Sequence, residues 1–345
     1  MIFGPNSRMR DDSTLTAEPF VAPVQAVAPE SPSSQIWTAR RAAVLVIAYF
    51  AALATLVLTR GVHISSDRYF LILLVPAVAL GLTRQYLRDW VPFIALMIAY
   101  EFARGGAEWL NADILGRGPF YAPMIDVDRA LFFGAMPPEF VQGWFWTGHV
   151  RWFDWVIGSF NKVHFFVPPT LLFVIWLDRR QHFVRCATAI VITSFIGAAI
   201  FFLFPAAPPW LASEHGLIHV VSINSLQDAA NGLPKGSSFI ASQIPRNAVA
   251  AVPSLHSAYA LLTLMIAWTW RPRVGYAFLV YPLVMWFSII YLGDHYVADI
   301  IAGVAVALIG WALAGHLTRP GGALHRLMAG PAEPLRLART FGGTT

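Results

Sequence analysis

The sequence is poor in charge and nearly without cysteine. Charged residues make up 12% of its 345 residues, against about 25% in a typical soluble globular chain. Its single cysteine, Cys186, excludes an intrachain disulfide and so a disulfide-stabilised scaffold. Hydrophobic residues reach 57% and fall in long blocks rather than in short alternating patterns. The composition therefore excludes a soluble or disordered chain and predicts an all-α, polytopic membrane protein.

The first 35 residues also lack an apolar core, so we expect no cleavable signal peptide. They are rich in proline, serine, alanine and glutamate, a composition typical of disorder. We predict a disordered tail over residues 1–36.

What the sequence does hold is a series of apolar segments typical of membrane-spanning helices. Such a helix needs about 20 apolar residues, within a range of about 17–25. The candidate segments cover residues 42–59, 69–82, 90–103, 164–177, 186–204, 255–270, 275–292 and 298–315. The second, third and fourth are short by that measure. We predict a helical bundle with about eight transmembrane helices.

The charge distribution indicates the orientation of the chain. A formal charge of +5 would be compatible with nucleic acid as a partner. With the N-terminus inside, however, 15 of the 24 basic residues fall in inner segments, and the short loops at 84–88, 179–185 and 271–273 are all basic. Cytoplasmic loops of membrane proteins carry this excess. We expect both termini to be cytoplasmic and no nucleic acid partner.

Two long stretches are placed outside the membrane, at about 104–163 and 205–254. The first is rich in Trp and Phe between residues 144 and 155, interleaved with charged residues. That mixture favours a helical segment in the outer interface, between the third and fourth spans. It is either an ordinary aromatic belt or a cover over a site open to lipid.

Polar residues converge at the outer helix ends. Ser254 and His256 open the sixth span, and His295 and Asp299 lie before the eighth. On a helix, positions 295 and 299 share one face. Asp299 can then accept a hydrogen bond from one imidazole nitrogen of His295, which leaves the other nitrogen as a base or nucleophile. His164 and the proline-rich turn 204–210 are placed on the same side of the membrane.

These residues suit phosphoryl transfer through a phosphohistidine. Ser254 lies where a helix begins, so its hydroxyl and the following N–H groups predict an anion site. His295 would attack phosphorus and Asp299 would orient it. His256 would protonate the leaving oxygen and then take a proton from the incoming hydroxyl. A metal site is the rival interpretation of two His and one Asp, although zinc favours more tightly spaced ligands.

The motifs resemble those of the type 2 phosphatidic acid phosphatase (PAP2) superfamily. Residues 253–256 resemble its PSxH motif, and His295 with Asp299 resembles the HxxxD of its third motif. The inositol phosphorylceramide synthase (Aur1-like) branch is more similar still. Segments that resemble this branch are FPAAPPW at 204–210, PSLHS at 253–257, GDHYVAD at 293–299, DVDRALFFG at 126–134 followed by Pro137-Pro138, and HFFVP at 164–168.

The resemblance implies a helical-bundle core, a His-His-Asp catalytic set, no metal or other cofactor, and a lipid-linked phosphate substrate. It divides the chain into N-terminal transmembrane helices at 37–118, a catalytic membrane domain at 119–316 and a cytoplasmic tail at 317–345.

One element of the superfamily pattern is missing. The first motif, KxxxxxxRP, is absent, because Lys162 is followed by Pro168 and Pro169 without an arginine. A phosphate still needs cations or donors around it. Arg246 is the first candidate, followed by Lys162 and Lys235, and His164 is placed in the same phosphate-binding set. Each cation also has the simpler interpretation of an interfacial side chain that reaches toward water.

Three functions follow as hypotheses. The first is a lipid phosphotransferase at the extracytoplasmic face of the plasma (inner) membrane. It would move a phosphate or phosphorylated headgroup from a phospholipid or polyprenyl-phosphate donor to a lipid or sugar hydroxyl. The second is a phosphatase for a lipid phosphate or polyprenyl diphosphate, with the same residues and water as acceptor. The third is a transporter or scaffold without chemistry, although transport predicts polar residues nearer the midplane.

Overall fold

The computed structural model describes residues 48, 66–230, 250–322 and 324. Within these ranges the secondary structure is helical and contains no strand. Two isolated bridges join the backbone of Ala206 to Phe120 and to Ala250. The predicted all-α class is confirmed for the described part of the chain. The first predicted span, 42–59, lies outside it, as do Lys235 and Arg246.

Among the described residues, three helical segments are long and apolar enough to cross a membrane. They are α8 (Arg180–Leu203), the stretch Pro272–Tyr291, and α15 (Val297–Thr318). A fourth is formed if α6 (Trp152–His164) and α7 (Val167–Asp178), which meet at 45°, make one bent span. A shorter apolar helix covers Phe70–Ala79. The total of about eight spans stays a prediction.

The remaining elements complete the bundle and its cap. The bundle also contains α2 (Ser66–Ala79), α3 (Thr83–Trp109) and α12 (Leu255–Trp270). The stretch Pro272–Tyr291 consists of α13 (Pro272–Ala277) and α14 (Val280–Tyr291). A π-helical turn, η1 (Leu110–Ile114), continues α3. The short helices are α4 (Ala122–Leu131), α5 (Pro137–Phe145), α9 (Pro209–Glu214) and α10 (Ile223–Ala230).

Proline explains several of these helix ends. Pro137 and Pro209 are the first residues of α5 and α9, where a missing N–H costs nothing. Pro168 and Pro169 follow the break between α6 and α7 and cannot donate to the preceding turn. The chain therefore bends by 45° just after His164, the last residue of α6. The predicted outer stretch 104–163 accordingly ends in a helix that leads into the fourth span.

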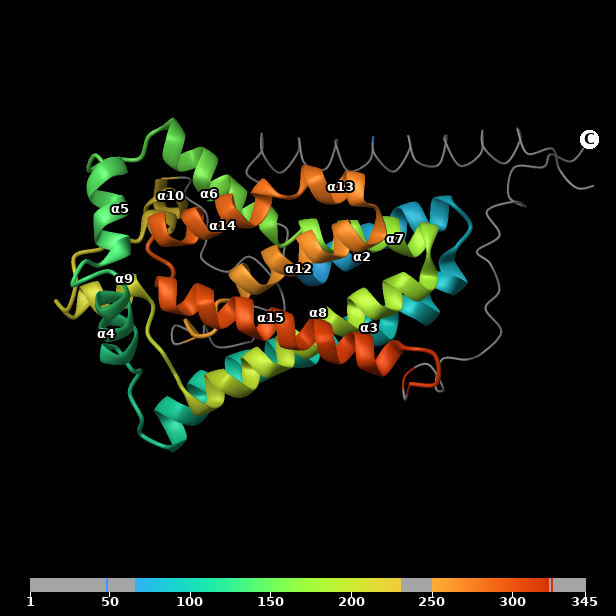
Figure 1. Ribbon diagram of the computed structural model, residues 1–345, viewed down its shortest axis with the longest axis horizontal. Helices are drawn as coiled ribbons and strands as arrows, with labels where there is room; N and C mark the ends of the chain where they lie inside the picture. Colours follow the sequence, from blue (N-terminus) through green and yellow to red (C-terminus); the bar gives the residue numbers. More distant parts are fainter. Residues whose placement is uncertain (1–47, 49–65, 231–249, 323, 325–345) are drawn as a thin grey trace, which may run out of the picture.

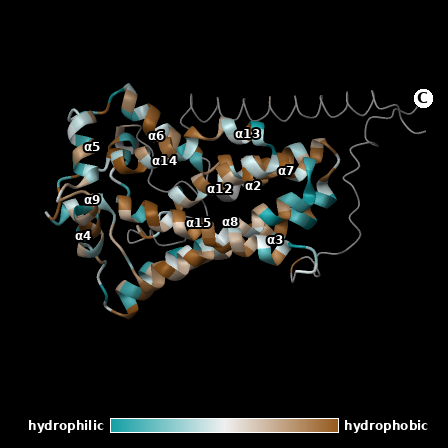
Figure 2. Cartoon of the chain, in the orientation of Figure 1, coloured by the Kyte–Doolittle hydropathy of each residue, from teal (hydrophilic) through white to brown (hydrophobic). Residues whose placement is uncertain are grey.

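The long helices pack through small residues. α15 lies against α8 and α12. A Cβ at Gly310 of α15 would collide with the Thr193 hydroxyl of α8, and one at Gly197 of α8 would lie 3.0 Å from Leu255. Small residues let helices approach closely where lipid provides no hydrophobic force between them. On α15, Ile301 and Leu308 are about half exposed, as expected of a face toward lipid. Figure 2 colours the ribbon by hydropathy and shows hydrophobic residues along the long helices of the bundle.

The short helices gather at one end of the bundle (Figure 1). There α4, α5, α9 and α10 lie on the same side of the molecule as the N-terminal end of α15. α4 contacts α15, α5 contacts α14, and α10 contacts α6. The predicted placement of this cap in the outer membrane interface stays a prediction. The arrangement brings α4 against the first turn of α15, which directly follows His295.

Candidate active site

The structure brings His256, His295 and Asp299 into one row. Asp299 Oδ2 lies 3.2 Å from His295 Nδ1, and His295 Nε2 lies 3.3 Å from His256 Nδ1. Asp299 is fully buried, and His295 is 6% exposed. If Nδ1 of His295 carries the proton, it donates to the carboxylate and Nε2 presents its lone pair. The row thus contains a buried carboxylate, an imidazole that it can orient, and a second imidazole.

A tight turn between α14 and α15 places His295. Gly293 has φ of +79°, and a Cβ there would lie 2.7 Å from the Val221 carbonyl oxygen. A side chain would therefore be strained by both conformation and contact. The His295 N–H donates to the Ile289 carbonyl at 3.1 Å, so the turn folds back on the end of α14.

Asp299 also accepts a backbone hydrogen bond at the start of α15. Its Oδ2 accepts the Tyr296 N–H at 3.0 Å as well as the imidazole of His295. One carboxylate oxygen therefore caps the helix and orients His295. Asp299 Oδ1 is buried and has no hydrogen-bond partner among the described residues.

His256 is positioned by contacts between α12 and α15. Ser254 caps α12, where its hydroxyl accepts the Ser257 N–H at 3.3 Å. Its own N–H donates to the Asp299 carbonyl at 3.0 Å. Gly303 makes this approach feasible, because a Cβ there would collide with the Ser254 carbonyl oxygen. Ser254 is fully buried and engaged as a cap, and its predicted contact with phosphate stays a prediction.

His164 lies behind His256 rather than beside His295. Its Nδ1 is 2.6 Å from the Tyr281 hydroxyl, and its ring centroid is 5.7 Å from that of His256. Its Nε2 is buried without a partner in the described ranges. Lys162 is partly exposed on α6, two residues earlier. The phosphate-binding roles of both stay predictions.

Burial controls the charge of His295. His295 lies in the turn between α14 and α15, and burial lowers its pKa to about 4 because the charged imidazolium is poorly solvated there. The imidazole is therefore neutral near pH 7 and available as a nucleophile.

Two residues near the site were missed from sequence. Asp128 of α4 is fully buried and accepts the N–H groups of Val297 at 3.0 Å and Ala298 at 2.8 Å. Burial raises the pKa of Asp128, and these two backbone donors oppose that rise. The carboxylate thus holds the first turn of α15 from a helix 169 residues away. Its segment was noticed as a family motif, but nothing local indicated this contact.

The second missed residue is Arg104 of α3. Its guanidinium pairs with Glu101 at 2.8 Å. It lies close enough to His256 and Tyr259 to act on both electrostatically. From the sequence alone, two opposite charges three positions apart indicate an ordinary ion pair on the surface of one helix. Only the packing of α3 places this cation near the imidazole of His256.

Residues 122–313, more than half of the chain, match the PAP2 superfamily, and the chain belongs to it. The match contains His256, His295 and Asp299. The resemblance inferred from the motifs is therefore confirmed.

Among curated proteins the chain is similar to the phosphoinositol dihydroceramide synthase of Bacteroides thetaiotaomicron. Identity is 34% over 158 residues, which are 42% of this chain and 50% of that protein. The inositol phosphorylceramide synthase of Candida albicans is 29% identical over 171 residues, 47% of this chain and 35% of its own length. The matches thus span half or less of these relatives. No solved structure matches the chain at comparable significance.

Proposed function

We propose that this protein is a lipid phosphotransferase that works through a phosphohistidine on His295. The row Asp299–His295–His256, with contacts of 3.2 and 3.3 Å, is the observation that carries the proposal. It supplies an oriented nucleophile and a proton carrier next to each other, which is what covalent phosphoryl transfer needs.

In the first step, His295 Nε2 attacks the phosphorus of a donor phosphodiester. A nitrogen–phosphorus bond forms, and the bond from phosphorus to the lipid alcohol breaks. His256, which takes up a proton as the anionic donor binds beside it, gives that proton to the leaving oxygen. In-line attack puts the entering nitrogen and the leaving oxygen on opposite sides of phosphorus. The His256 ring therefore moves away from His295 as the donor binds.

In the second step, an acceptor hydroxyl replaces the lost alcohol. His256, now neutral, takes the hydroxyl proton while the oxygen attacks phosphorus. The nitrogen–phosphorus bond breaks and His295 returns to its neutral form. Asp299 stabilises the positive charge on His295 in both steps. Protons and bonds balance over the cycle, because each proton given by His256 is taken back.

The negative charge on the phosphoryl oxygens needs a cation beside it in the transition state. Arg104 is our candidate among the described residues, because its guanidinium is fixed by Glu101 and acts on His256. It would supply the charge that the missing first motif provides elsewhere in the superfamily.

The names of the relatives indicate the substrates. One relative is named a phosphoinositol dihydroceramide synthase and another an inositol phosphorylceramide synthase. Both names mention a phosphorylated inositol and a ceramide-type lipid. We propose that this chain takes a phosphorylated polyol headgroup from a phospholipid and places it on a hydroxyl of a ceramide-like lipid. The reaction would take place at the extracytoplasmic face of the inner membrane.

The test uses the full chain purified in detergent with phosphatidylinositol, a fluorescent ceramide and EDTA. We expect a new phospholipid that depends on the acceptor, and a loss of at least about a thousandfold in His295→Ala. His149→Ala is the matched control, because His149 is exposed in the cap. A His295→Ala variant with wild-type turnover would refute the nucleophile. Release of the phosphorylated headgroup to water, with no new lipid, would make the protein a phosphohydrolase instead.

A further inference from the structure

Gln142 of α5 is a buried glutamine of the cap whose side chain reaches the end of α14. It is 5% exposed. Its Oε1 accepts the Val221 N–H at 2.8 Å, and its Nε2 donates to the carbonyls of Val221 and Tyr291, each at 2.8 Å. The amide thus uses its oxygen and both of its N–H groups. The opposite orientation would set the amide oxygen against both carbonyls, so these contacts fix the direction in which the amide points.

The cap donates to three successive backbone carbonyls at the end of α14. Carbonyls at the C-terminus of a helix have no partner within the helix, so they need donors from elsewhere. The donors come from three separate cap elements, α5, α10 and α9. They are Gln142 Nε2 to Tyr291, the Ile223 N–H to Leu292 at 3.2 Å, and the Trp210 N–H to Gly293 at 3.1 Å. His295 follows two residues after the last of these carbonyls.

The contact between the cap and this turn is tight. A Cβ at Gly293 would lie 3.3 Å from Gln142 Nε2 and 2.8 Å from Val220 Cγ1. Val220 and Tyr296, the residue after His295, belong to one buried hydrophobic cluster. The segment around residue 221 and the turn are therefore packed against each other, and Gln142 bonds to both.

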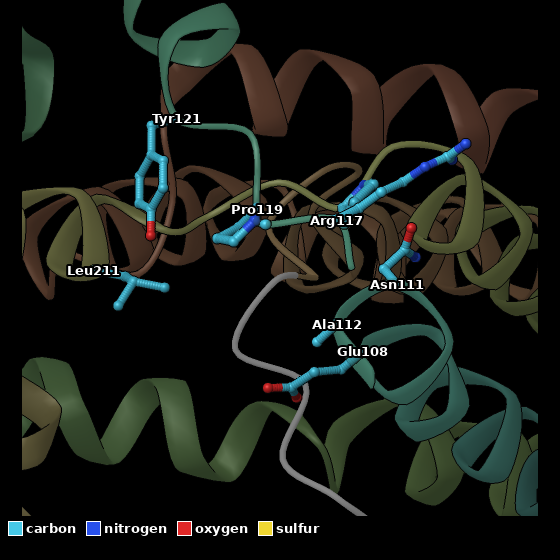
Figure 3. Close-up of a pocket in the computed structure, with 9 residues that line it drawn as sticks. Glu108, Asn111, Ala112, Arg117, Pro119, Tyr121 and Leu211 are labelled. Atoms are coloured by element: carbon cyan, nitrogen blue, oxygen red, sulfur yellow. The ribbon is translucent and has the colours of Figure 1, made fainter. Parts of the chain in front are cut away.

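The other two cap elements have supports of their own. α10 is tied to α6 by Gln227, whose Nε2 donates to the Asp154 carbonyl at 2.5 Å. α9 buries Ala212 in the cluster just described. Leu211 beside it lines a pocket near the end of α3, together with Tyr121 (Figure 3). Loss of the α5 amide should therefore loosen the turn without unfolding the cap.

We propose that Gln142 is a positioning residue that sets where His295 lies relative to His256. It acts through the turn, because its side-chain hydrogen bonds go to backbone groups of residues 221 and 291. The inference rests on the proposed function, since it concerns the step in which His295 attacks phosphorus. A displacement of about 1 Å can cost roughly a hundredfold in rate. The amide therefore acts on turnover rather than on binding of the donor.

The first test compares Gln142→Leu and Gln142→Glu with the wild type in the transfer assay. Gln142→Leu removes all three hydrogen bonds. Gln142→Glu keeps the size of the side chain but offers at most one donor, so at least one of the two carbonyls loses its partner. We expect kcat to fall by about tenfold or more in both variants and KM for the donor lipid to stay within about twofold.

Gln181→Leu is the matched control, because Gln181 is exposed at the start of α8. It should leave kcat and KM unchanged. Wild-type kcat in either variant of Gln142 overturns the inference while the transferase activity stands.

Backbone hydrogen–deuterium exchange separates failure of this inference from failure of the proposed function, because it needs no turnover. Mass spectrometry follows the peptide that covers residues 289–297 in the wild type and in both variants. We expect this peptide to exchange at least about tenfold faster in the variants, and peptides of α8 to exchange as in the wild type.

Faster exchange confined to the turn supports the positioning role even if the wild type turns over no donor. Wild-type exchange over residues 289–297 overturns it. An equal rise throughout the helices would show a loss of overall stability rather than of local position, and would overturn it as well.

Discussion

A single oxygen of Asp299 accepts both the imidazole of His295 at 3.2 Å and the Tyr296 N–H at 3.0 Å. The sequence predicted this contact from helical spacing, but His295 precedes α15, and the capping turn rather than the helix brings its imidazole to Asp299. The distance of 3.3 Å between His295 and His256 was not predictable in this way. Thirty-nine residues separate them, so the pair depends on how α12 and α15 pack.

Burial of His295 leads to a prediction about pH. Its pKa of about 4 lies below the ordinary value of about 6.5. We expect the rate of phosphohistidine formation to fall by less than about twofold from pH 7 to 5.5. An exposed imidazole would lose about tenfold over the same range. Rapid-quench trapping with labelled donor measures this rate.

Protein stability is the control for that experiment. The unfolded chain takes up a proton at His295 near pH 6.5, and the folded chain only near pH 4. The folded state therefore loses stability as pH falls between these values, by up to roughly 3 kcal/mol from this group. Unfolding midpoints at each pH show whether the enzyme is intact. A tenfold fall per pH unit below 6.5, in folded protein, contradicts the shifted pKa.

At the scale of elements, α15 is held at its first turn by two carboxylates. Asp299 comes from the helix itself, and Asp128 comes from α4 and accepts two of its N–H groups. Negative groups at a helix N-terminus are favourable because the N–H groups there have no partner in the helix. α4 thus fixes the helix that carries Asp299.

We expect Asp128→Asn to lower kcat by about tenfold or more and KM by little. An amide presents only one acceptor oxygen, so one N–H of α15 loses its partner and the start of the helix shifts. Unfolding free energy should fall by about 1–3 kcal/mol. The transfer assay and a thermal melt measure these effects.

Asp126→Asn is the matched control, because Asp126 is exposed on the same helix. It should leave both quantities unchanged. Asp128→Glu keeps both oxygens and should restore part of kcat. Wild-type kcat and stability in Asp128→Asn would show that α4 does not position α15.

At the scale of the whole molecule, the cap and the basic loops lie toward opposite ends of the bundle. α4, α5 and α9 lie at one end in Figure 1, and the connection between α12 and α13 lies toward the other. The positive-inside rule assigns the basic end to the cytoplasm. The active site is then predicted on the outer face, where a donor in the outer leaflet reaches it.

Cysteine labelling tests this orientation. Asp126→Cys in α4 and Arg273→Cys in α13 are exposed positions at the two ends. The native Cys186 is buried and gives little background. We expect a membrane-impermeant maleimide to label residue 126 in intact cells and residue 273 only after permeabilisation. The reverse pattern would place the active site in the cytoplasm.

The sequence by itself determined the class, the apolar segments and the residues of the row. These depend on composition and on motifs of residues close together in the sequence, and both are local properties. The reach of Asp128 to α15 and the position of Arg104 were decided only by tertiary structure. Each depends on the packing of helices far apart in the chain. The apolar pattern says which faces are buried, but it does not say which helix lies against which.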